Sequence, residues 1–219
     1  MKSLSFFGLA LSAVLLSSGA IAQQYLEGTH YTEIETPVNT KVSAEQVELV
    51  EVFSYACPHC QRFEPHINEW LANTKPDNVV FRRVPASFNP TYQTFAQAYV
   101  TADVLGVAEE THGPMFSAIH EEKRRFRNTE DLLDFYNEFG VDKEQFKSTA
   151  ESFAVVTRLS QEANDIGRYG IRGTPSLIIN GKYLVSATKD VPTHPEMIAV
   201  ANYLIDQELA RMKQAVAAE

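Results

Sequence analysis

Only two cysteines occur in this chain of 219 residues, Cys57 and Cys60, and they flank Pro58 and His59 in a CPHC sequence. Two thiols at this spacing can close into a disulfide, pass that disulfide to another thiol and be oxidised again. The CPHC sequence therefore predicts a dithiol–disulfide exchange site. Cys57 and Cys60 would be its catalytic residues, with no cofactor beyond their own disulfide.

The CPHC sequence lies where a strand is expected to give way to a helix. Residues 47–55 are rich in Val, Phe and Leu, which is typical of a buried strand, and Phe63, Ile67 and Trp70 then follow at helical spacing. A thiolate at a helix N-terminus is stabilised by unpaired backbone N–H groups and by the helix dipole. We therefore expect the pKa of Cys57 to lie below that of an ordinary thiol.

The two residues between the cysteines, Pro58 and His59, are expected to adjust the reactivity of the thiols. Pro58 suits the first helical turn because it has no N–H to lose and its φ is already helical. His59 adds a hydrogen-bond donor, or a positive charge, beside the sulfur of Cys57.

Three other interpretations of the cysteines stay open: a structural disulfide, a zinc site and a pair of reduced core residues. A disulfide across so short a loop would contribute only about 2 kcal/mol. Zinc would need two more ligands, and the remaining histidines show no pair at zinc-binding spacing, so no metal is expected. A Pro-His insert at a strand–helix corner is an unusual way to build a core.

The sequence SYACPHCQRFEP after an apolar strand, together with IRGTPSLIINGKY far downstream, resembles the DsbA family of thiol:disulfide interchange proteins. The similarity extends over nearly the whole chain from Tyr25 onward. This resemblance implies a thioredoxin fold, an exported disulfide oxidant and an inserted helical domain that covers the active-site face.

Glu51 is an unexpected acid within the predicted buried strand, because an unpaired carboxylate is costly to bury. It either lies near a strand end and reaches water, or it is a buried proton acceptor behind the cysteines. The resemblance favours the second interpretation, since DsbA proteins keep a glutamate at this place. Residues 79–84 predict a second, parallel strand in which Arg82 and Arg83 face opposite sides. By its position in the resemblance, Arg83 is the better partner for Glu51, and a solvated arginine is the alternative.

Pro175 stands just before a short strand expected at residues 176–179. It resembles the cis-proline that faces the CxxC site in thioredoxin folds. This implies that the backbone of Thr174 is free to pair with an extended substrate segment. A trans proline that ends the preceding loop is the alternative. Thr174 also departs from the valine found here in some DsbA proteins.

We expect an α/β protein with three parts. Residues 1–22 would be a signal peptide, residues 23–88 and 162–219 a thioredoxin-like domain, and residues 89–161 an inserted helical domain. The helical stretch is too long to fit within a thioredoxin core. An edge strand is expected over residues 25–36.

Several local signals mark the ends of elements. Thr129, Asp142 and Thr193 would cap helices, and Asn180-Gly181 predicts a type I′ hairpin. His112 and His120 are expected to be surface or capping residues.

The leader has Lys2, an apolar run and the A-x-A site that ends at Ala22, so cleavage after Ala22 and export to the periplasm are expected. An uncleaved membrane anchor is the alternative, but the apolar run is short. The net charge of −9 argues against binding to nucleic acid or to anionic membranes.

The activity predicted is donation of the Cys57–Cys60 disulfide to unfolded or folding secreted proteins, through a mixed disulfide at Cys57. The resemblance implies reoxidation by a membrane partner of the DsbB type, and we expect a monomer. A disulfide isomerase or reductase would use the same motif, although isomerases usually need a dimerisation domain. A chaperone or adhesin without redox activity is the other class, and it would tolerate loss of Cys57.

Overall fold

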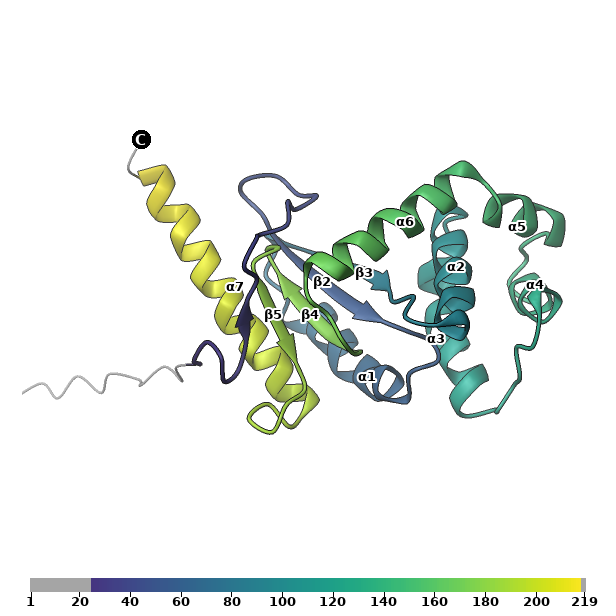
Figure 1. Cartoon of the computed structure of the whole chain (residues 1–219), viewed down its shortest axis with the longest axis horizontal. Coiled ribbons are helices and arrows are strands. Elements are labelled where there is room, and N and C mark those ends of the chain that lie inside the picture. The colour runs from purple at the N-terminus through teal and green to yellow at the C-terminus, as the bar shows by residue number, and fades with distance from the viewer. Residues whose placement is uncertain (1–24, 218–219) are drawn as a thin grey trace, which may run out of the picture.

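The computed structural model describes residues 25–217 (Figure 1). The predicted signal peptide at residues 1–22 lies outside this range. Within the described range, no helix is both long enough and apolar enough to cross a membrane.

A five-stranded mixed sheet with the order β1-β5-β4-β2-β3 forms the centre of the thioredoxin-like part. Its strands are β1 (Thr32–Glu33), β2 (Val47–Phe53), β3 (Val79–Pro85), β4 (Ser176–Ile179) and β5 (Tyr183–Ser186). The central strand β2 pairs parallel with β3 and antiparallel with β4, and all its residues are buried. The parallel pairing agrees with the expectation that a helix connects β2 to β3.

The edge strand predicted over residues 25–36 is wrong in length, because only Thr32–Glu33 pairs with β5. The preceding residues form a tight turn instead, in which the Gly28 N–H donates to the Tyr31 carbonyl at 2.8 Å. Gly28 has a φ of +71°, so the chain cannot continue as a strand there.

Two helices cover one face of the sheet: α1 (Pro58–Asn73) and α7 (His194–Ala217). Phe63 and Ile67 of α1 share a core with Leu49 of β2. The opposite face of β2, which carries Val50 and Val52, packs against the end of α6 (Phe153–Arg168). The alternation of side chains along β2 therefore divides the core into two layers.

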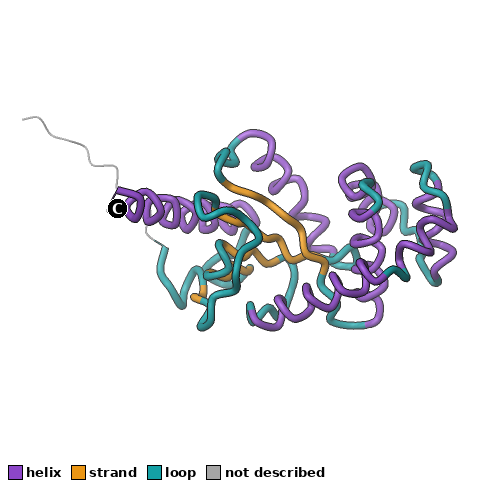
Figure 2. Tube along the Cα trace, turned by 90° about the horizontal axis from the view of Figure 1, so that it is seen from above, coloured by secondary structure: helices purple, strands orange, loops and turns teal. Residues whose placement is uncertain are grey.

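The helical domain packs at the end of the sheet that carries the CPHC sequence (Figures 1 and 2). It contains α2 (Pro90–Val104), α3 (Ala108–His120), α4 (Thr129–Asn137), α5 (Lys143–Ala150) and the start of α6. Its core is continuous with Phe53, Tyr55 and both cysteines. Helix α6 joins the two parts, since Val155 lies in the helical core and Ile166 in the sheet core. The predicted division after residue 161 thus falls within one continuous helix.

Most of the predicted helix caps are present. The Asp142 carboxylate accepts from the Gln145 N–H at 2.8 Å, and the Thr193 hydroxyl accepts from the Glu196 N–H at 3.3 Å while it donates to the Glu196 carboxylate at 2.9 Å. The cap predicted at Thr129 is wrong by one residue: the Asn128 side chain accepts from the Asp131 N–H, and Thr129 is the first residue of α4.

The hairpin between β4 and β5 has the predicted type I′ conformation, with a φ of 51° at Asn180 and 65° at Gly181. The Gly181 carbonyl also accepts from the Val38 N–H at 2.9 Å, which ties the N-terminal segment to the hairpin. A Cβ at Gly181 would lie 1.9 Å from the Val38 carbonyl oxygen. Both the turn and this close approach therefore require glycine.

We predict that Gly181→Ala lowers the free energy of unfolding by more than about 2 kcal/mol, because positive-φ strain adds to a backbone clash. Gly28→Ala is the matched control, since it shares the positive φ but would place its Cβ in open space. It should cost only about 1 kcal/mol. Urea unfolding of the two variants measures the difference, and equal losses would contradict the clash.

Candidate active site

Cys57 is the N-cap of α1 and Pro58 is the first helical residue, so the predicted strand–helix junction is present. Both cysteines are thiols in this structure, and both are buried, with 4% of Cys57 and 0% of Cys60 exposed. Exposure therefore does little to distinguish the two sulfurs. Their electrostatic environments distinguish them strongly.

The pKa of Cys57 is lowered to about 5. The hydrogen bond from the Cys60 thiol is the largest cause, and it outweighs the desolvation that opposes ionisation. The Thr174 side chain and the backbone N–H groups of Cys60 and His59 add to the effect. These donors all point at the N-cap sulfur because they belong to the first turn of α1 and to the facing loop.

The pKa of Cys60 moves the opposite way and is raised far above that of an ordinary thiol. Burial is the first cause, and the proximity of Cys57 is the second. In the reduced protein, Cys57 therefore carries the negative charge at neutral pH while Cys60 keeps its proton and donates it as a hydrogen bond.

His59 acts on Cys57 through its backbone N–H. Its ring Nδ1 lies 3.0 Å from an Arg62 guanidinium nitrogen. Arginine can only donate, so this nitrogen must accept and the ring is neutral in this arrangement. The positive charge that the sequence suggested for His59 is therefore absent from this arrangement.

The Thr174–Pro175 peptide bond is cis, as predicted. The Thr174 carbonyl oxygen lies 3.3 Å from the Cys57 sulfur, so this loop faces the reactive thiol. The hydroxyl of Ser176 fixes the base of the loop by donating to the Gly173 carbonyl at 2.9 Å, and it also contacts the Ser186 hydroxyl at 2.9 Å.

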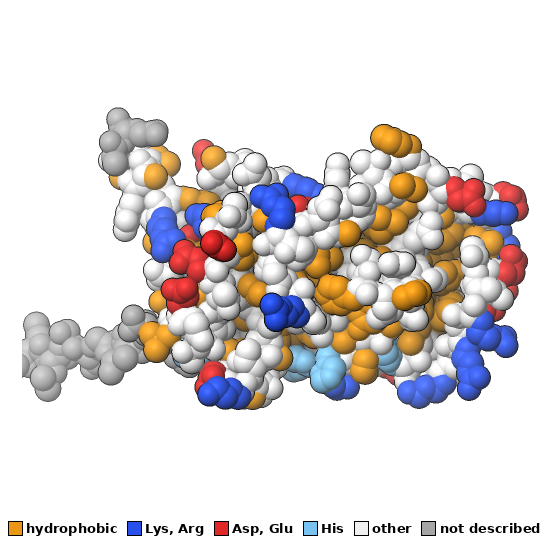
Figure 3. Space-filling view, viewed as in Figure 1, with side chains coloured by type: hydrophobic (Ala, Val, Ile, Leu, Met, Phe, Trp, Pro, Cys, Tyr) orange, Lys and Arg blue, Asp and Glu red, His pale blue; other side chains and the backbone are white. Residues whose placement is uncertain are grey.

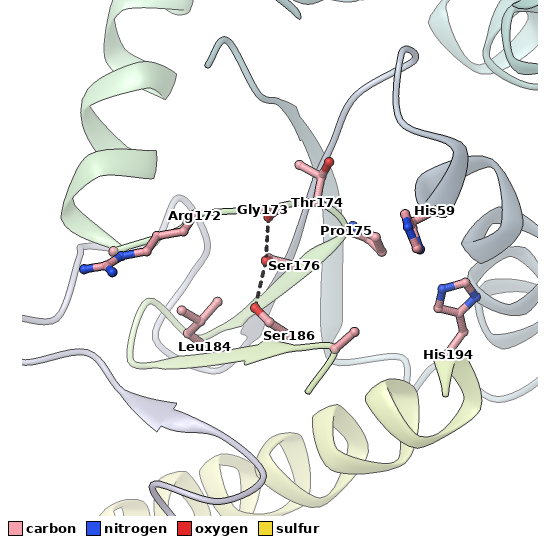
Figure 4. Close-up of a pocket in the computed structure, with 11 residues that line it drawn as sticks. His59, Arg172, Gly173, Thr174, Pro175, Ser176, Leu184, Ser186 and His194 are labelled. Carbon is pink, nitrogen blue, oxygen red and sulfur yellow. Dashed lines mark hydrogen bonds between the residues drawn. The ribbon is translucent and has the colours of Figure 1, made fainter. Parts of the chain in front are cut away.

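A cavity of about 410 Å³ opens beside this loop, between the loop, His59 and His194. Figure 4 shows Pro175 next to His59, with His194 below them at the start of α7. We refer to this space as the cis-proline cavity.

Glu51 is fully buried, so the interpretation that it reaches water is wrong. Its Oε2 lies 3.2 Å from Nε of Arg83, whose side chain is 4% exposed, and this is the partner that the family resemblance favoured. Burial and the neighbouring Glu64 carboxylate raise the pKa of Glu51 to about 8, although Arg83 opposes the shift. Within residues 25–217, no hydrogen bond joins Glu51 to Cys60 directly, so its role as a proton acceptor stays a prediction.

His112 is a buried residue that contacts Glu64, and the sequence analysis missed it. Its Nε2 lies 3.1 Å from Glu64, and its Nδ1 lies 3.0 Å from the Tyr55 hydroxyl. Burial is the main cause that lowers its pKa, against the opposing effect of Glu64. The expectation of a surface position was wrong for His112. Helical spacing from Ala108 to Met115 and Phe116 places it on their apolar face, and this was the signal available in the sequence.

His120 also reaches the active site, because its Nε2 donates to the Tyr55 carbonyl at 2.7 Å. It therefore tethers α3 to the segment that leads into the CPHC sequence. Within the described part of the chain, no group of three or more His, Cys, Asp or Glu residues is placed to hold a metal ion.

Comparison with known proteins places the chain in one family. A family model described as a DSBA-like thioredoxin domain matches residues 79–199. The chain is 34% identical over 214 residues to the thiol:disulfide interchange protein DsbA of Pseudomonas aeruginosa, covering 98% of this chain and 100% of that protein. It is 35% identical over 219 residues to the protein of the same name from Pseudomonas syringae, with the same coverage.

Solved structures of DsbA proteins also match this chain. The crystal structure of Pseudomonas aeruginosa DsbA matches with a TM-score of 0.80 and 35% identity, over 86% of this chain and 97% of that chain. The oxidoreductase DsbA from Xylella fastidiosa matches with a TM-score of 0.79 and 32% identity, over 85% of this chain and 98% of that chain. The chain belongs to the DSBA-like thioredoxin domain family and is a thiol–disulfide oxidoreductase. Proteins of this family work with a redox-active disulfide, and Cys57 and Cys60 are the only cysteines of this chain.

We predict that Cys57 titrates with a pKa near 5 in the reduced protein, and that Cys60→Ala raises this pKa by about one to two units. Cys60→Ser is the matched control, because it keeps a hydrogen-bond donor and should retain most of the shift. The ultraviolet absorbance of the thiolate across a pH titration measures the pKa of Cys57 in all three proteins. An unchanged pKa in Cys60→Ala would show that the Cys60 thiol does not stabilise the anion.

Proposed function

We propose that the oxidised protein donates its Cys57–Cys60 disulfide to reduced proteins through a mixed disulfide at Cys57. The observation that carries this proposal is the opposite displacement of the two thiol pKa values. A substrate thiolate attacks the Cys57 sulfur, the Cys57–Cys60 bond breaks, and Cys60 leaves as a thiolate that takes up a proton. A second substrate thiolate then attacks the substrate sulfur of the mixed disulfide and releases Cys57 as a stable thiolate.

The low pKa of Cys57 supports the second step, since a thiol with a lower pKa is a faster leaving group. It also stabilises the reduced product, because the released anion is held by the donors around the helix N-terminus. The substrate is oxidised by two electrons and the dithiol form of this protein is the reduced product.

The cis-proline loop supports a mode of substrate binding. The Thr174 carbonyl faces Cys57 at 3.3 Å, and the cis-proline cavity lies beside it. An extended substrate segment can pair with the Thr174 backbone by strand addition, with its side chains in the cavity. Binding through backbone groups suits folding proteins of many sequences.

The cellular setting follows from the sequence and from the family. A signal peptide cleaved after Ala22 would deliver the protein to the periplasm, where disulfides persist. Its substrates would be exported proteins with free thiols, and a membrane oxidase of the DsbB type would restore the disulfide. We propose that it acts as a monomer and binds no nucleic acid.

We predict that Cys60→Ala accumulates a mixed disulfide when it is mixed with a disulfide-linked peptide, because the Cys57 thiolate attacks and no second thiol releases the adduct. Cys57→Ala should form little adduct, since the raised pKa of Cys60 keeps this thiol protonated. Mass spectrometry under non-reducing conditions measures both. Equal adduct formation by Cys57→Ala would refute the assignment of Cys57 as the attacking sulfur.

We further propose that Glu51 exchanges a proton with Cys60. Cys60 becomes a strongly basic thiolate when it leaves, so it needs a proton at that moment. A pKa of about 8 means that Glu51 carries a proton at neutral pH and can give it up or take it back. Glu51 therefore suits both directions of the exchange.

We predict that Glu51→Gln slows oxidation of a dithiol peptide at about pH 7 by at least tenfold, because an amide cannot supply the proton. Glu48→Gln is the matched control, since Glu48 is buried on the same strand but is paired with Arg82 at 2.8 Å on the other face. Stopped-flow rates are compared, with melting curves to confirm folding. Equal rates in the two variants would remove the proton-transfer role.

A further inference from the structure

A second cavity, of about 630 Å³, lies on the other side of His59, between α1 and the start of α7. Its charged and titratable lining consists of His59, Arg62, His66 and His194, and we call it the histidine–arginine cavity. None of the described residues that line it is Asp or Glu, although the chain has 28 acidic and 19 basic residues. Histidine side chains gather along the lower edge of the molecule in Figure 3, where blue basic side chains lie close by.

Among residues 25–217, no Asp or Glu forms a salt bridge with Arg62, His66 or His194 of this cavity. Arg62 donates to the ring of His59 at 3.0 Å, which is a neutral acceptor. The rings of His66 and His194 lie 5.7 Å apart in an edge-on arrangement. Burial lowers the pKa of His194, and the neighbouring His66 and Arg62 lower it further. The helices α1 and α7 also begin here, so both present the positive ends of their dipoles.

The acidic groups near the cavity are already engaged or lie outside its lining. Glu121 accepts from Gln61 at 3.3 Å, and Glu196 accepts from the Thr193 hydroxyl at 2.9 Å. Glu69 lies with His66 along a neighbouring hollow. A carboxylate from another molecule would therefore meet the unpaired donors of Arg62 and of the histidines directly.

The position of the cavity points to a polypeptide as its occupant. His59 and His194 line both this cavity and the cis-proline cavity, so the two spaces adjoin at these residues, and Thr174 of the cis-proline cavity contacts Cys57. A substrate segment paired with Thr174 would carry its next residues toward the histidine–arginine cavity. The protein carries a net charge of −9, which repels an acidic segment from most of its surface. The positive groups of the histidine–arginine cavity would attract such a segment locally.

We propose that the histidine–arginine cavity binds acidic side chains that flank the reacting cysteine of a substrate polypeptide, and that this preference strengthens as the histidines become protonated. The proposal rests on the proposed function, because the cavity is assigned to the same substrate that reacts with Cys57. A bound carboxylate favours the imidazolium form, so acidic substrates and protons bind together. Because burial and the neighbouring groups lower the pKa of His194, selection should increase as the pH falls below the ordinary range of histidine titration.

The test uses two dithiol peptides that differ only in having Glu or Gln at the positions next to the cysteines. For the wild-type protein, we expect kcat/KM to favour the Glu peptide by about fivefold to tenfold at pH near 6, and by less at pH near 8. Arg62→Gln and His66→Gln should remove most of this preference.

Lys189→Gln is the matched control for charge, since it removes one positive charge from a side chain that is 90% exposed outside the cavity. It should keep the preference for the Glu peptide. Loss of the preference in Lys189→Gln as well would reduce the effect to overall charge and overturn the proposal. Inhibition of both peptides alike by inorganic phosphate would make the cavity a small-anion site and would also overturn it.

The two proposals fail in different ways. Equal rates for the two peptides with the wild-type protein would refute the histidine–arginine cavity but leave the disulfide donation intact. Failure to oxidise either peptide would refute the donation itself.

Discussion

The buried guanidinium of Arg83 constrains much of the structure around the cysteines. A charge in the protein interior is tolerated only when opposite charges surround it, and removing one partner of such a group costs about 3–5 kcal/mol. Arg83, on β3, lies 3.2 Å from Glu51 on β2 and 3.5 Å from Glu64 on α1. It also lies 3.6 Å from Glu109 on α3. The sheet, the active-site helix and the helical domain therefore converge on one charge.

Glu64 extends this arrangement into the helical domain, because His112 binds its other carboxylate oxygen and also contacts the Tyr55 hydroxyl. Tyr55 lies two residues before Cys57. The chain of contacts from Arg83 through Glu64 and His112 thus ends at the segment that places the N-cap cysteine. Packing of the helical domain and placement of the thiol are parts of the same network.

The two thiols have opposite properties because they occupy opposite ends of the first helical turn. Cys57 lies at the N-cap, where N–H groups and the Cys60 thiol donate to its sulfur. Cys60 is inside the helix and inside the core, where an anion would have to be formed without water. One helix start therefore creates both a stable thiolate and a strongly basic one, which is the asymmetry that disulfide donation uses.

The sequence by itself determined the features that depend on neighbouring residues. The strand–helix junction at Cys57, the caps at Asp142 and Thr193, and the hairpin at Asn180-Gly181 follow from local backbone preferences, and all are present. The pairing of Arg83 with Glu51 was reached only with the help of the family resemblance. The cap at Thr129 was displaced by one residue because Asn128 offers an equally good acceptor.

Only the tertiary structure decided which distant side chains meet. His112 became a buried partner of Glu64 because α3 packs against α1, and His66 met His194 because α7 begins beside α1. The neutral state of His59 likewise depends on where the Arg62 side chain points. Such contacts are set by the packing of whole elements, and a histidine has the same letter in the sequence whether it faces water, a carboxylate or another histidine.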